Sequence, residues 1–249
     1  MRRFYLPNQT FELNKALVIQ NASEIHHMTN VLRFKKGDEV IIFNDEKKEA
    51  VCVIETFSTN QINLTVKKII EKKEKKLPKI ILGCAVPKKG KFEWIIEKCT
   101  ELGVNEIYPM KTKRTEVVFS ADKMKAKIKR FQTVAVNAAK QCQRNDVPKI
   151  LPMTSLEDVI KKDFGFSLKL IPCLIKDRKP ILEILSSHCE IESVSVLIGP
   201  EGDFTEEEVN KALALGYVPV SLGETTLKVE TAAISVISCV KLFYDQLSI

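Results

Sequence analysis

The spacing of hydrophobic positions divides the chain into two parts. Before residue 70, short runs rich in valine, isoleucine and phenylalanine alternate with turn residues, which predicts strands at 15–20, 39–44, 50–57 and 61–69. The last three follow closely on one another, as in a meander that closes into a small barrel. One interval differs, because its apolar residues recur at helical spacing behind a capping Ser23, and it predicts a helix over 23–33.

Beyond Pro78 the pattern alternates between buried strands and amphipathic helices. Strands are predicted at 79–86, 105–110, 150–153, 168–175, 193–198 and 218–222. Helices are predicted at 91–102, 123–144, 155–162, 180–187, 205–215 and 230–247. Repeated βα units of this kind indicate a parallel sheet covered by helices. The charged segment 67–79 has the composition of a connector, so we expect domains at 1–72 and 73–249.

The predicted last helix carries more apolar surface than packing on one sheet face requires. One stripe holds Ala233, Val236, Ile237, Val240 and Tyr244. Further apolar residues widen that stripe, namely Ile234, Cys239, Phe243 and Leu247. Excess apolar surface on a helix indicates a partner.

Composition places the chain among ordinary globular proteins. Its 249 residues are 45% hydrophobic and 29% charged, and no apolar run approaches the ~18 residues that cross a bilayer. The basic start is not followed by the apolar segment of a signal peptide, so we expect a cytoplasmic protein without membrane contact. Seven cysteines without a C-x-x-C pair, and only three histidines, favour reduced thiols over disulfides or a metal site.

Charge is unevenly distributed along the chain. Residues 1–76 hold 14 Lys and Arg against 10 Asp and Glu, residues 77–149 hold 16 against 7, and residues 150–249 hold 9 against 15. A concentrated positive field attracts polyanions, so nucleic acid is the first partner to consider. Solvated lysine-rich helix faces account for the same numbers, and charge alone leaves both readings open.

Two glycine-containing loops leave successive predicted strands. They are GPEGDFT at 199–205 and LGETTLKVETAA at 222–233. In open α/β sheets ligands bind beyond the carboxyl ends of strands, and glycine lets the backbone approach them closely. Two such walls suit a flat uncharged group such as adenine, although ordinary strand-to-helix turns also explain both loops. The chain has neither G-x-G-x-x-G nor a P-loop motif, so the usual dinucleotide and phosphate sites are not supported.

Taken together, the motifs resemble those of one enzyme family. Besides the two glycine loops they include EKCTELGV (97–104), KTKRT (111–115) and NAAKQCQRNDVP (137–148), with RRFYLP and HHMTNVLRFKKGD (26–38) near the start. This combination is similar to the 16S ribosomal RNA uridine N3-methyltransferases, the RsmE type of the SPOUT class. The resemblance implies an α/β fold in which a PUA-like β-barrel precedes a SPOUT-type parallel sheet with a C-terminal trefoil knot. It also implies a homodimer that binds S-adenosylmethionine.

The same resemblance assigns residues to the cofactor. Those implied to bind S-adenosylmethionine are Pro172, Gly199, Glu201, Gly202, Leu222, Gly223, Leu227, Thr231 and Ala232. The assignment of Pro172 depends only on the position of its strand in the chain order. The chain departs from the family pattern at Asp203, where glycine is usual, and at Lys228, where arginine is usual. Lysine keeps the charge but loses the planar bidentate fork of arginine.

The resemblance also implies catalytic and RNA-binding positions. The side chains expected nearest the methyl transfer are Glu201, Lys228 and Arg144. Those expected to contact RNA are Arg33, Lys35, Lys88, Arg114, Gln141 and Arg144. Exposed charged turns and a solvated helix face explain several of these equally well. No metal is expected.

The expected reaction is methyl transfer to N3 of a uridine in 16S ribosomal RNA, either free or in the small subunit. N3 carries a proton and lies on the pairing edge, so the base must be unpaired and the proton must leave. A carboxylate could take that proton, or a cation could stabilise the uridine anion while water takes it. Two alternatives stay open: a SPOUT methyltransferase for a different RNA nucleotide, and a non-catalytic RNA-binding factor, which the departures at Asp203 and Lys228 support.

Overall fold

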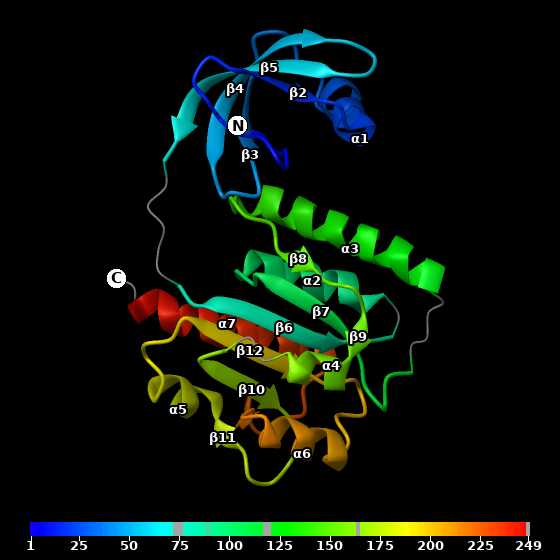
Figure 1. Ribbon diagram of the computed structural model, residues 1–249, viewed down its shortest axis with the longest axis vertical. Helices are drawn as coiled ribbons and strands as arrows, with labels where there is room; N and C mark the ends of the chain where they lie inside the picture. The colour runs from blue at the N-terminus through cyan, green and yellow to red at the C-terminus, as the bar shows by residue number, and fades with distance from the viewer. Residues whose placement is uncertain (72–76, 89, 117–120, 163–164, 248–249) are drawn as a thin grey trace. The chain divides into compact units, whose positions relative to one another are not determined.

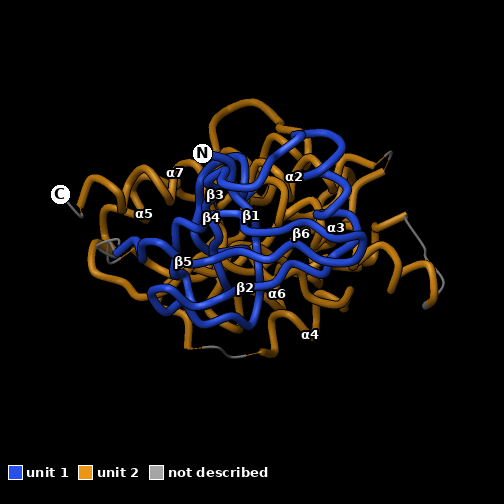
Figure 2. The backbone as a smooth tube through the Cα atoms, turned by 90° about the horizontal axis from the view of Figure 1, so that it is seen from above, with its two compact units in different colours: residues 1–74, 139–147 blue, residues 75–138, 148–249 orange. Residues whose placement is uncertain are grey.

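The computed structural model describes residues 1–71, 77–88, 90–116, 121–162 and 165–247. The chain forms two compact units (Figure 2): unit 1 comprises residues 1–74 and 139–147, and unit 2 comprises residues 75–138 and 148–249. The expected domain boundary between 72 and 73 lies outside the described residues. The segment 139–147, which the sequence pattern assigned to the second domain, belongs to unit 1.

Unit 1 is built on a five-stranded sheet with the strand order β1-β3-β4-β5-β2. Its strands are β1 (Arg3–Tyr5), β2 (Ala16–Ile19), β3 (Glu39–Phe43), β4 (Glu49–Phe57) and β5 (Ile62–Ile70). β1 runs parallel to β3, and the other pairs are antiparallel. The four predicted strands are confirmed. β1 was not predicted, because three residues are too few to show a period.

The core of unit 1 follows from alternation along these strands. Inward positions are fully buried, as in Val40 and Ile42 of β3 or Ile62 and Leu64 of β5, while Ile41 and Asn63 between them are only partly buried. This two-residue period is what one buried face of a sheet requires. Met28, from the helical segment, is also fully buried in this cluster.

The predicted helix over 23–33 is wrong in its form. A short α-helix, α1 (Ala22–His26), is followed by a π-helical turn, η1 (His27–Val31), and the capping side chain is Asn21, which accepts from the amides of Ser23 and Glu24. The wider π turn shifts the register of the residues beyond it. Val31, expected in the buried stripe, is therefore 60% exposed.

Unit 2 contains an eight-stranded sheet in which all the pairs are parallel, as predicted. The strand order is β11-β13-β10-β12-β6-β7-β8, with β9 also paired to β7. The strands are β6 (Lys79–Ala85), β7 (Glu106–Lys111), β8 (Lys149–Ile150), β9 (Thr154–Ser155), β10 (Leu168–Pro172), β11 (Lys179–Pro180), β12 (Ser193–Ile198) and β13 (Val218–Ser221). Six consecutive residues of β6 are buried, as expected of a strand covered on both faces.

Helices stand on both sides of this sheet (Figure 1). They are α2 (Lys91–Glu101), α3 (Ala121–Gln141), α4 (Leu156–Lys161), α5 (Ile181–Ser186), α6 (Glu206–Ala214) and α7 (Val229–Leu247). α4 and α6 pack in one cluster with the sheet residues Ile81, Ile171 and Leu197. α7 packs against α2, α5 and β12, and the five residues of its predicted stripe are all buried.

Three predicted elements differ from the structure in their extent. The predicted strand 150–153 is two short pieces, because Pro152 between them has no amide to donate to a ladder. The strand predicted to reach 175 stops at Pro172. α3 ends at Gln141 rather than 144, since Gln143 has a left-handed φ of 63° that cannot continue a helix.

The seven cysteines are all free, in agreement with the prediction of reduced thiols. Burial raises the pKa of both Cys52 and Cys99 to about 12, so these thiols stay protonated. Across the described ranges, no helix is long and apolar enough to cross a membrane.

Candidate functional site

A pocket of about 260 Å³ lies beyond the carboxyl ends of β10, β12 and β13. Three stretches of chain line it: 172–174 together with Arg178, then 198–201 with Asp203, and finally 220–223 and 225–229 together with Ala232. This is the edge of a parallel sheet where ligands generally bind. Its volume lies near the lower end of the ~300–1,000 Å³ typical of small-molecule sites.

The first glycine loop turns sharply between β12 and α6. A Cβ on Gly199 would meet the Phe204 ring at 3.1 Å, so glycine permits this close packing. Asp203 has a left-handed φ of 59°, a conformation that aspartate tolerates better than most residues. Thr205 then caps α6 in a capping box with Glu208.

The second glycine loop leaves β13 with Gly223 at its bend. Gly223 has a φ of 123°, and a Cβ there would meet no atom within 4 Å. The hydroxyl of Ser221 accepts from the Gly223 amide at 3.2 Å, which fixes the bend. The loop ends where the Ala232 amide donates to the Lys228 carbonyl at 2.8 Å and α7 begins.

The third wall of the pocket, beside the two glycine loops, is formed by residues 172–174 at the end of β10. Asp203 Oδ2 accepts from the Leu174 amide at 2.8 Å, across from the first glycine loop. Arg178 Nη1 donates to the Cys173 carbonyl at 3.1 Å. These two hydrogen bonds define the path of residues 172–178 along the pocket.

Glu201 is an exposed residue of the pocket lining, and its carboxylate is hydrogen-bonded to the loop after β6. Its Oε1 accepts from the backbone amide of Lys88 at 3.1 Å. The Lys88 ammonium is paired with Glu116 at 2.6 Å, and the hydrogen bond from this pair is the largest cause of the raised pKa of Lys88. Lys88 thus contributes its amide to the site, while its half-exposed ammonium lies next to an acid.

Arg114 is bound directly to the first glycine loop. Its Nη1 donates to the carbonyls of Gly202 at 2.6 Å and Phe204 at 3.3 Å. The predicted RNA-contacting arginine therefore also supports the backbone that forms one wall of the pocket.

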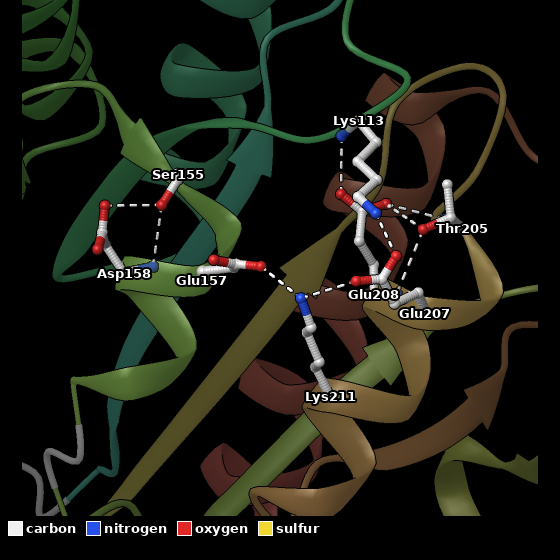
Figure 3. A network of polar contacts seen from close by, with 8 residues as sticks. All are labelled: Lys113, Ser155, Glu157, Asp158, Thr205, Glu207, Glu208 and Lys211. Atoms are coloured by element: carbon white, nitrogen blue, oxygen red, sulfur yellow. Dashed lines mark hydrogen bonds and ion pairs between the residues drawn. The ribbon is translucent and has the colours of Figure 1, made fainter.

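The loop after β7 that carries Lys113 and Arg114, here called the arginine loop, is connected to α6 and α4 by a polar network (Figure 3). The buried Glu208 accepts from the amide of Lys113 at 2.7 Å and from that of Thr205 at 2.9 Å. Lys211 bridges Glu157 at 2.5 Å and Glu207 at 2.9 Å, and Lys113 pairs with Glu207 as well. Hydrogen bonds from Lys113 and Lys211 lower the pKa of Glu207 to about 2.

At the start of α7, Glu230 pairs with Lys91 of α2 at 2.5 Å. Burial acts to raise the pKa of Glu230, but the hydrogen bond from Lys91 and nearby charges outweigh it, so the pKa lies below its usual range. The pair joins the helix after β6 to the helix that completes the pocket.

In unit 1, the segment 139–147 is hydrogen-bonded to the five-stranded sheet and its loops. Arg3 pairs with Glu49 at 2.5 Å, both side chains are nearly inaccessible at 7% and 2%, and Arg3 Nη2 also donates to the Arg144 carbonyl at 3.0 Å. Asn145 donates to the Lys47 carbonyl at 2.7 Å. The Arg144 guanidinium itself is paired with Asp146 at 2.8 Å.

The predicted site residues fall into four groups. Those that line the pocket are Pro172, Gly199, Glu201, Leu222, Gly223, Leu227, Lys228 and Ala232. Gly202 and Thr231 are neighbours of the lining without belonging to it. Lys88 and Arg114 hold the first glycine loop, whereas Arg33, Lys35, Gln141 and Arg144 belong to unit 1.

Sequence reasoning missed two kinds of pocket residue. Thr225, Thr226 and Val229 lie within a motif already recognised, so their position in the loop was the available signal. Arg178 had no signal, because its charged surroundings are those of an ordinary exposed turn. Within the described parts of the chain, no group of three His, Cys, Asp or Glu side chains could hold a metal ion.

The chain combines a parallel sheet, with a small-molecule pocket at its carboxyl edge, and a separate five-stranded unit, as RNA methyltransferases with a PUA domain do. The family model described as an RNA methyltransferase domain matches residues 73–241, and the one described as an RNA methyltransferase PUA domain matches residues 19–67. The chain belongs to the RNA methyltransferase family, as a member of its ribosomal RNA small subunit methyltransferase E group. The resemblance found in the sequence is confirmed.

Curated relatives carry this name in several bacteria. Ribosomal RNA small subunit methyltransferase E of Bacillus subtilis is 27% identical over 245 residues, which cover 96% of each chain. The protein of the same name from Synechocystis is 30% identical over 227 residues, covering 91% of this chain and 72% of that one.

Solved structures are similar along almost the whole chain. A Legionella pneumophila protein, solved in complex with bound S-adenosylmethionine, has a TM-score of 0.87 at 28% identity and 96% coverage of both chains. A Ribosomal RNA small subunit methyltransferase E from Neisseria gonorrhoeae has a TM-score of 0.86 at 22% identity and 98% coverage of both chains. At this identity the similarity shows a shared fold.

Proposed function

We propose that this protein transfers a methyl group from S-adenosylmethionine to N3 of a uridine in 16S ribosomal RNA, either free or within the small subunit. The observation that carries the proposal is the pocket at the carboxyl edge of β10, β12 and β13, in a member of the RNA methyltransferase family. The bound cofactor of the Legionella protein supports the choice of cofactor, and the names of the curated relatives support the substrate. Work on ribosomal RNA would place the protein in the cytoplasm.

The pocket residues fit this cofactor. Leu222 and Leu227 offer apolar contact beside the open backbone at Gly223, which suits an adenosine held by main-chain groups. Arg178 and Lys228 supply positive charge and Glu201 negative charge, which suits the carboxylate and ammonium of an amino-acid end. Bound there, the cofactor would supply an electrophilic methyl group on a sulfonium.

The protein's own part in the chemistry is to position the base and to deal with the N3 proton. Glu201 and Lys228 both line the pocket, so either route stays open: the carboxylate accepts the proton, or the ammonium stabilises the uridine anion while water accepts it. Arg144 is proposed as the third catalytic side chain. Alignment of the methyl group with N3 would supply much of the rate.

The two routes for the proton predict different effects of substitutions at Glu201 and Lys228. If Glu201 is the base, Glu201→Gln lowers kcat by about 10²–10⁴ and removes the acidic limb of the pH–rate profile. If Lys228 stabilises the anion, Lys228→Met causes the larger loss and Lys228→Arg restores most of it. Single-turnover rates measured across pH distinguish the two.

We propose that residues 1–72 form an RNA-binding domain and residues 73–249 the catalytic domain. Arg33 and Lys35 are exposed in unit 1, where they are available to phosphate or base. Gln141 is exposed at the end of α3, and Lys88 and Arg114 would meet RNA beside the pocket. Affinity for RNA should fall with salt, by about 0.7–0.9 in log affinity per log salt for each phosphate neutralised.

We further propose that the carboxyl-terminal part of unit 2 is a trefoil knot. β13 lies between β11 and β10 in the sheet, so a later segment pairs with two strands that precede it in the chain. The loop after β13 then meets the loops after β10 and β12 at one pocket. The insertion of a later strand between two earlier ones supports a knotted path, which would depart from the usual rule of unthreaded topology.

A homodimer with shared sites completes the proposal. Leu242 and Leu247 of α7 are 59% and 52% exposed, beyond the stripe that packs inside unit 2, which supports an interface on this helix. Mixing inactive Arg144→Ala protein with inactive Gly223→Val protein should restore activity, because one site of a heterodimer would be intact. A monomer by light scattering at micromolar concentration would contradict this.

The whole proposal is tested by mapping the methylated nucleotides of ribosomal RNA from a strain that lacks this gene, with and without the gene restored. One N3-methyluridine in 16S RNA should disappear and return. Loss of a modification elsewhere would change the substrate. Unchanged RNA, together with no heat of S-adenosylmethionine binding by calorimetry, would indicate a non-catalytic RNA-binding protein.

A further inference from the structure

Asp203 occupies an unusual place in the pocket wall. Its φ of 59° is left-handed, and its amide donates to the Pro200 carbonyl at 2.9 Å to close the turn. Asp203 lines the pocket, and its carboxylate is hydrogen-bonded to both the loop after β12 and the loop after β10. The backbone conformation at this position suits glycine, asparagine and aspartate.

The two oxygens of this carboxylate bind two different segments. Oδ1 accepts from the adjacent Phe204 amide at 2.8 Å, and Oδ2 accepts from the Leu174 amide, also at 2.8 Å, which lies 29 positions away in the chain. Hydrogen bonds to an ionised acceptor are about twice as strong as neutral ones. One side chain thus ties the third wall of the pocket to the first glycine loop.

Leu174 is the most exposed residue of that wall. β10 ends at Pro172, and Cys173 is buried in the same apolar cluster as Phe204 of the first glycine loop, whereas the Leu174 side chain is 56% exposed and so gains little from packing. The Arg178 side chain donates to the Cys173 carbonyl at 3.1 Å, a contact within the same loop. The hydrogen bond from the Leu174 amide to Asp203 attaches this exposed part of the wall to the first glycine loop.

We propose that Asp203 is a positioning residue that holds the 172–174 wall in place for the cofactor; this inference rests on the proposed binding of S-adenosylmethionine in this pocket. A wall fixed before the ligand arrives lowers the ordering cost of binding. Without the carboxylate, the Leu174 amide loses its acceptor, and the cofactor must order this part of the wall when it binds.

The conformation of Asp203 allows a clean test. Asp203→Gly keeps the left-handed backbone and removes both acceptors, whereas Asp203→Asn keeps one carbonyl oxygen. Asn14→Gly is the matched control, because Asn14 has a φ of 62° and lies in unit 1. The measurements are S-adenosylmethionine affinity by calorimetry, amide hydrogen exchange without ligand, and the KM and kcat of methyl transfer.

Asp203→Gly should raise the Kd for S-adenosylmethionine about tenfold or more, with Asp203→Asn in between and Asn14→Gly unchanged. Exchange of the Leu174 amide in the ligand-free protein should accelerate about tenfold or more in Asp203→Gly, while exchange in the core of β6 stays as in wild type. KM for the cofactor should rise, and kcat at saturation should stay within about twofold.

Wild-type affinity and wild-type exchange in Asp203→Gly would overturn the proposal, as would equal losses in Asp203→Gly and Asn14→Gly. If the wild-type protein binds no S-adenosylmethionine, the proposed function fails. In that case exchange at Leu174 still decides whether Asp203 holds the wall.

Discussion

The two pocket glycines are required for different physical reasons. At Gly199 the space is filled, because the Phe204 ring occupies the position of a side chain. At Gly223 the space is open, and only the backbone angle of 123° demands glycine. A substitution at Gly199 disturbs the packing of the loop, whereas one at Gly223 projects into the region offered to a ligand.

Gly223→Val should weaken S-adenosylmethionine binding more than it weakens folding. The branched side chain would enter the pocket, and the positive φ would cost about 1–3 kcal/mol of strain. Gly216→Val is the control, since Gly216 also has a positive φ of 83° and open space around it but lies outside the pocket lining. Calorimetry should show loss of binding in the first variant alone, with similar melting temperatures. Equal affinities in the two variants would remove Gly223 from the site.

At the scale of elements, Glu208 connects a loop to a helix. Its two carboxylate oxygens satisfy the Thr205 amide at the start of α6 and the Lys113 amide of the arginine loop (Figure 3). An amide side chain offers a single oxygen, so it can satisfy only one of these donors. The position of Arg114 against the first glycine loop therefore depends on the buried carboxylate of Glu208 in α6.

Glu208→Gln should lower the free energy of unfolding by about 1–3 kcal/mol, because one buried amide loses its acceptor. Glu206→Gln makes the same chemical change in the exposed first turn of α6 and should cost less than about 1 kcal/mol. Urea unfolding of both variants gives the comparison. A cost at Glu208 no greater than at Glu206 would show that the connection contributes little.

The lowered pKa of Glu207 has a consequence for acid stability. A carboxyl group whose pKa is lower in the folded protein contributes stability above its unfolded pKa of ~4.3, and loses it as pH falls toward about 2. Carboxyl chemical shifts in an NMR titration should place Glu207 near 2. In Lys211→Met that value should rise, while a titration midpoint near 4 in the wild type would contradict the network.

The long elements were predictable because each carries several turns or pleats of its own pattern. The buried stripe of α7 and the continuous apolar run of β6 are examples. Elements of two or three residues, such as β1 and β11, show no period. The π turn after α1 was also beyond prediction, because the same apolar residues fit a regular helix.

The candidate site was predictable where it depends on local sequence. Glycine at a strand end marks both loops of the pocket, and chain order suggested the wall at Pro172. The bonds from Asp203 to Leu174 and from Arg114 to Gly202 join distant positions, so only the folded chain brings them together. Sequence patterns identify the loops, and tertiary structure decides what holds them.

At the scale of the whole molecule, the chain passes between the two units three times. It leaves unit 1 after residue 74, returns for 139–147, and then completes unit 2. The returning segment carries Arg144 and is held by the buried Arg3–Glu49 pair. Removal of residues 1–72 would therefore remove the Arg3–Glu49 pair that holds the Arg144 backbone, as well as the five-stranded sheet of unit 1.

Glu49→Gln should release this segment. Breaking a buried ion pair leaves an uncompensated charge and typically costs about 3–5 kcal/mol. We expect a lower melting temperature and weaker RNA binding, with S-adenosylmethionine affinity unchanged because the pocket lies in unit 2. Glu46→Gln, which alters an exposed pair with Lys48, is the control and should behave as wild type. Loss of cofactor binding in Glu49→Gln would show that the effect is not confined to unit 1.

The return of the chain to unit 1 also sets the order of events during synthesis (Figure 2). A ribosome releases the amino terminus first, and domains generally fold as their residues emerge. Here unit 1 lacks residues 139–147 until the 64 residues 75–138 have been made, so the first unit begun cannot be finished before part of the second has been synthesised. Nascent chains arrested before residue 139 should hold an incomplete unit 1 that proteases attack, and chains arrested after residue 147 should protect it once the segment has left the exit tunnel.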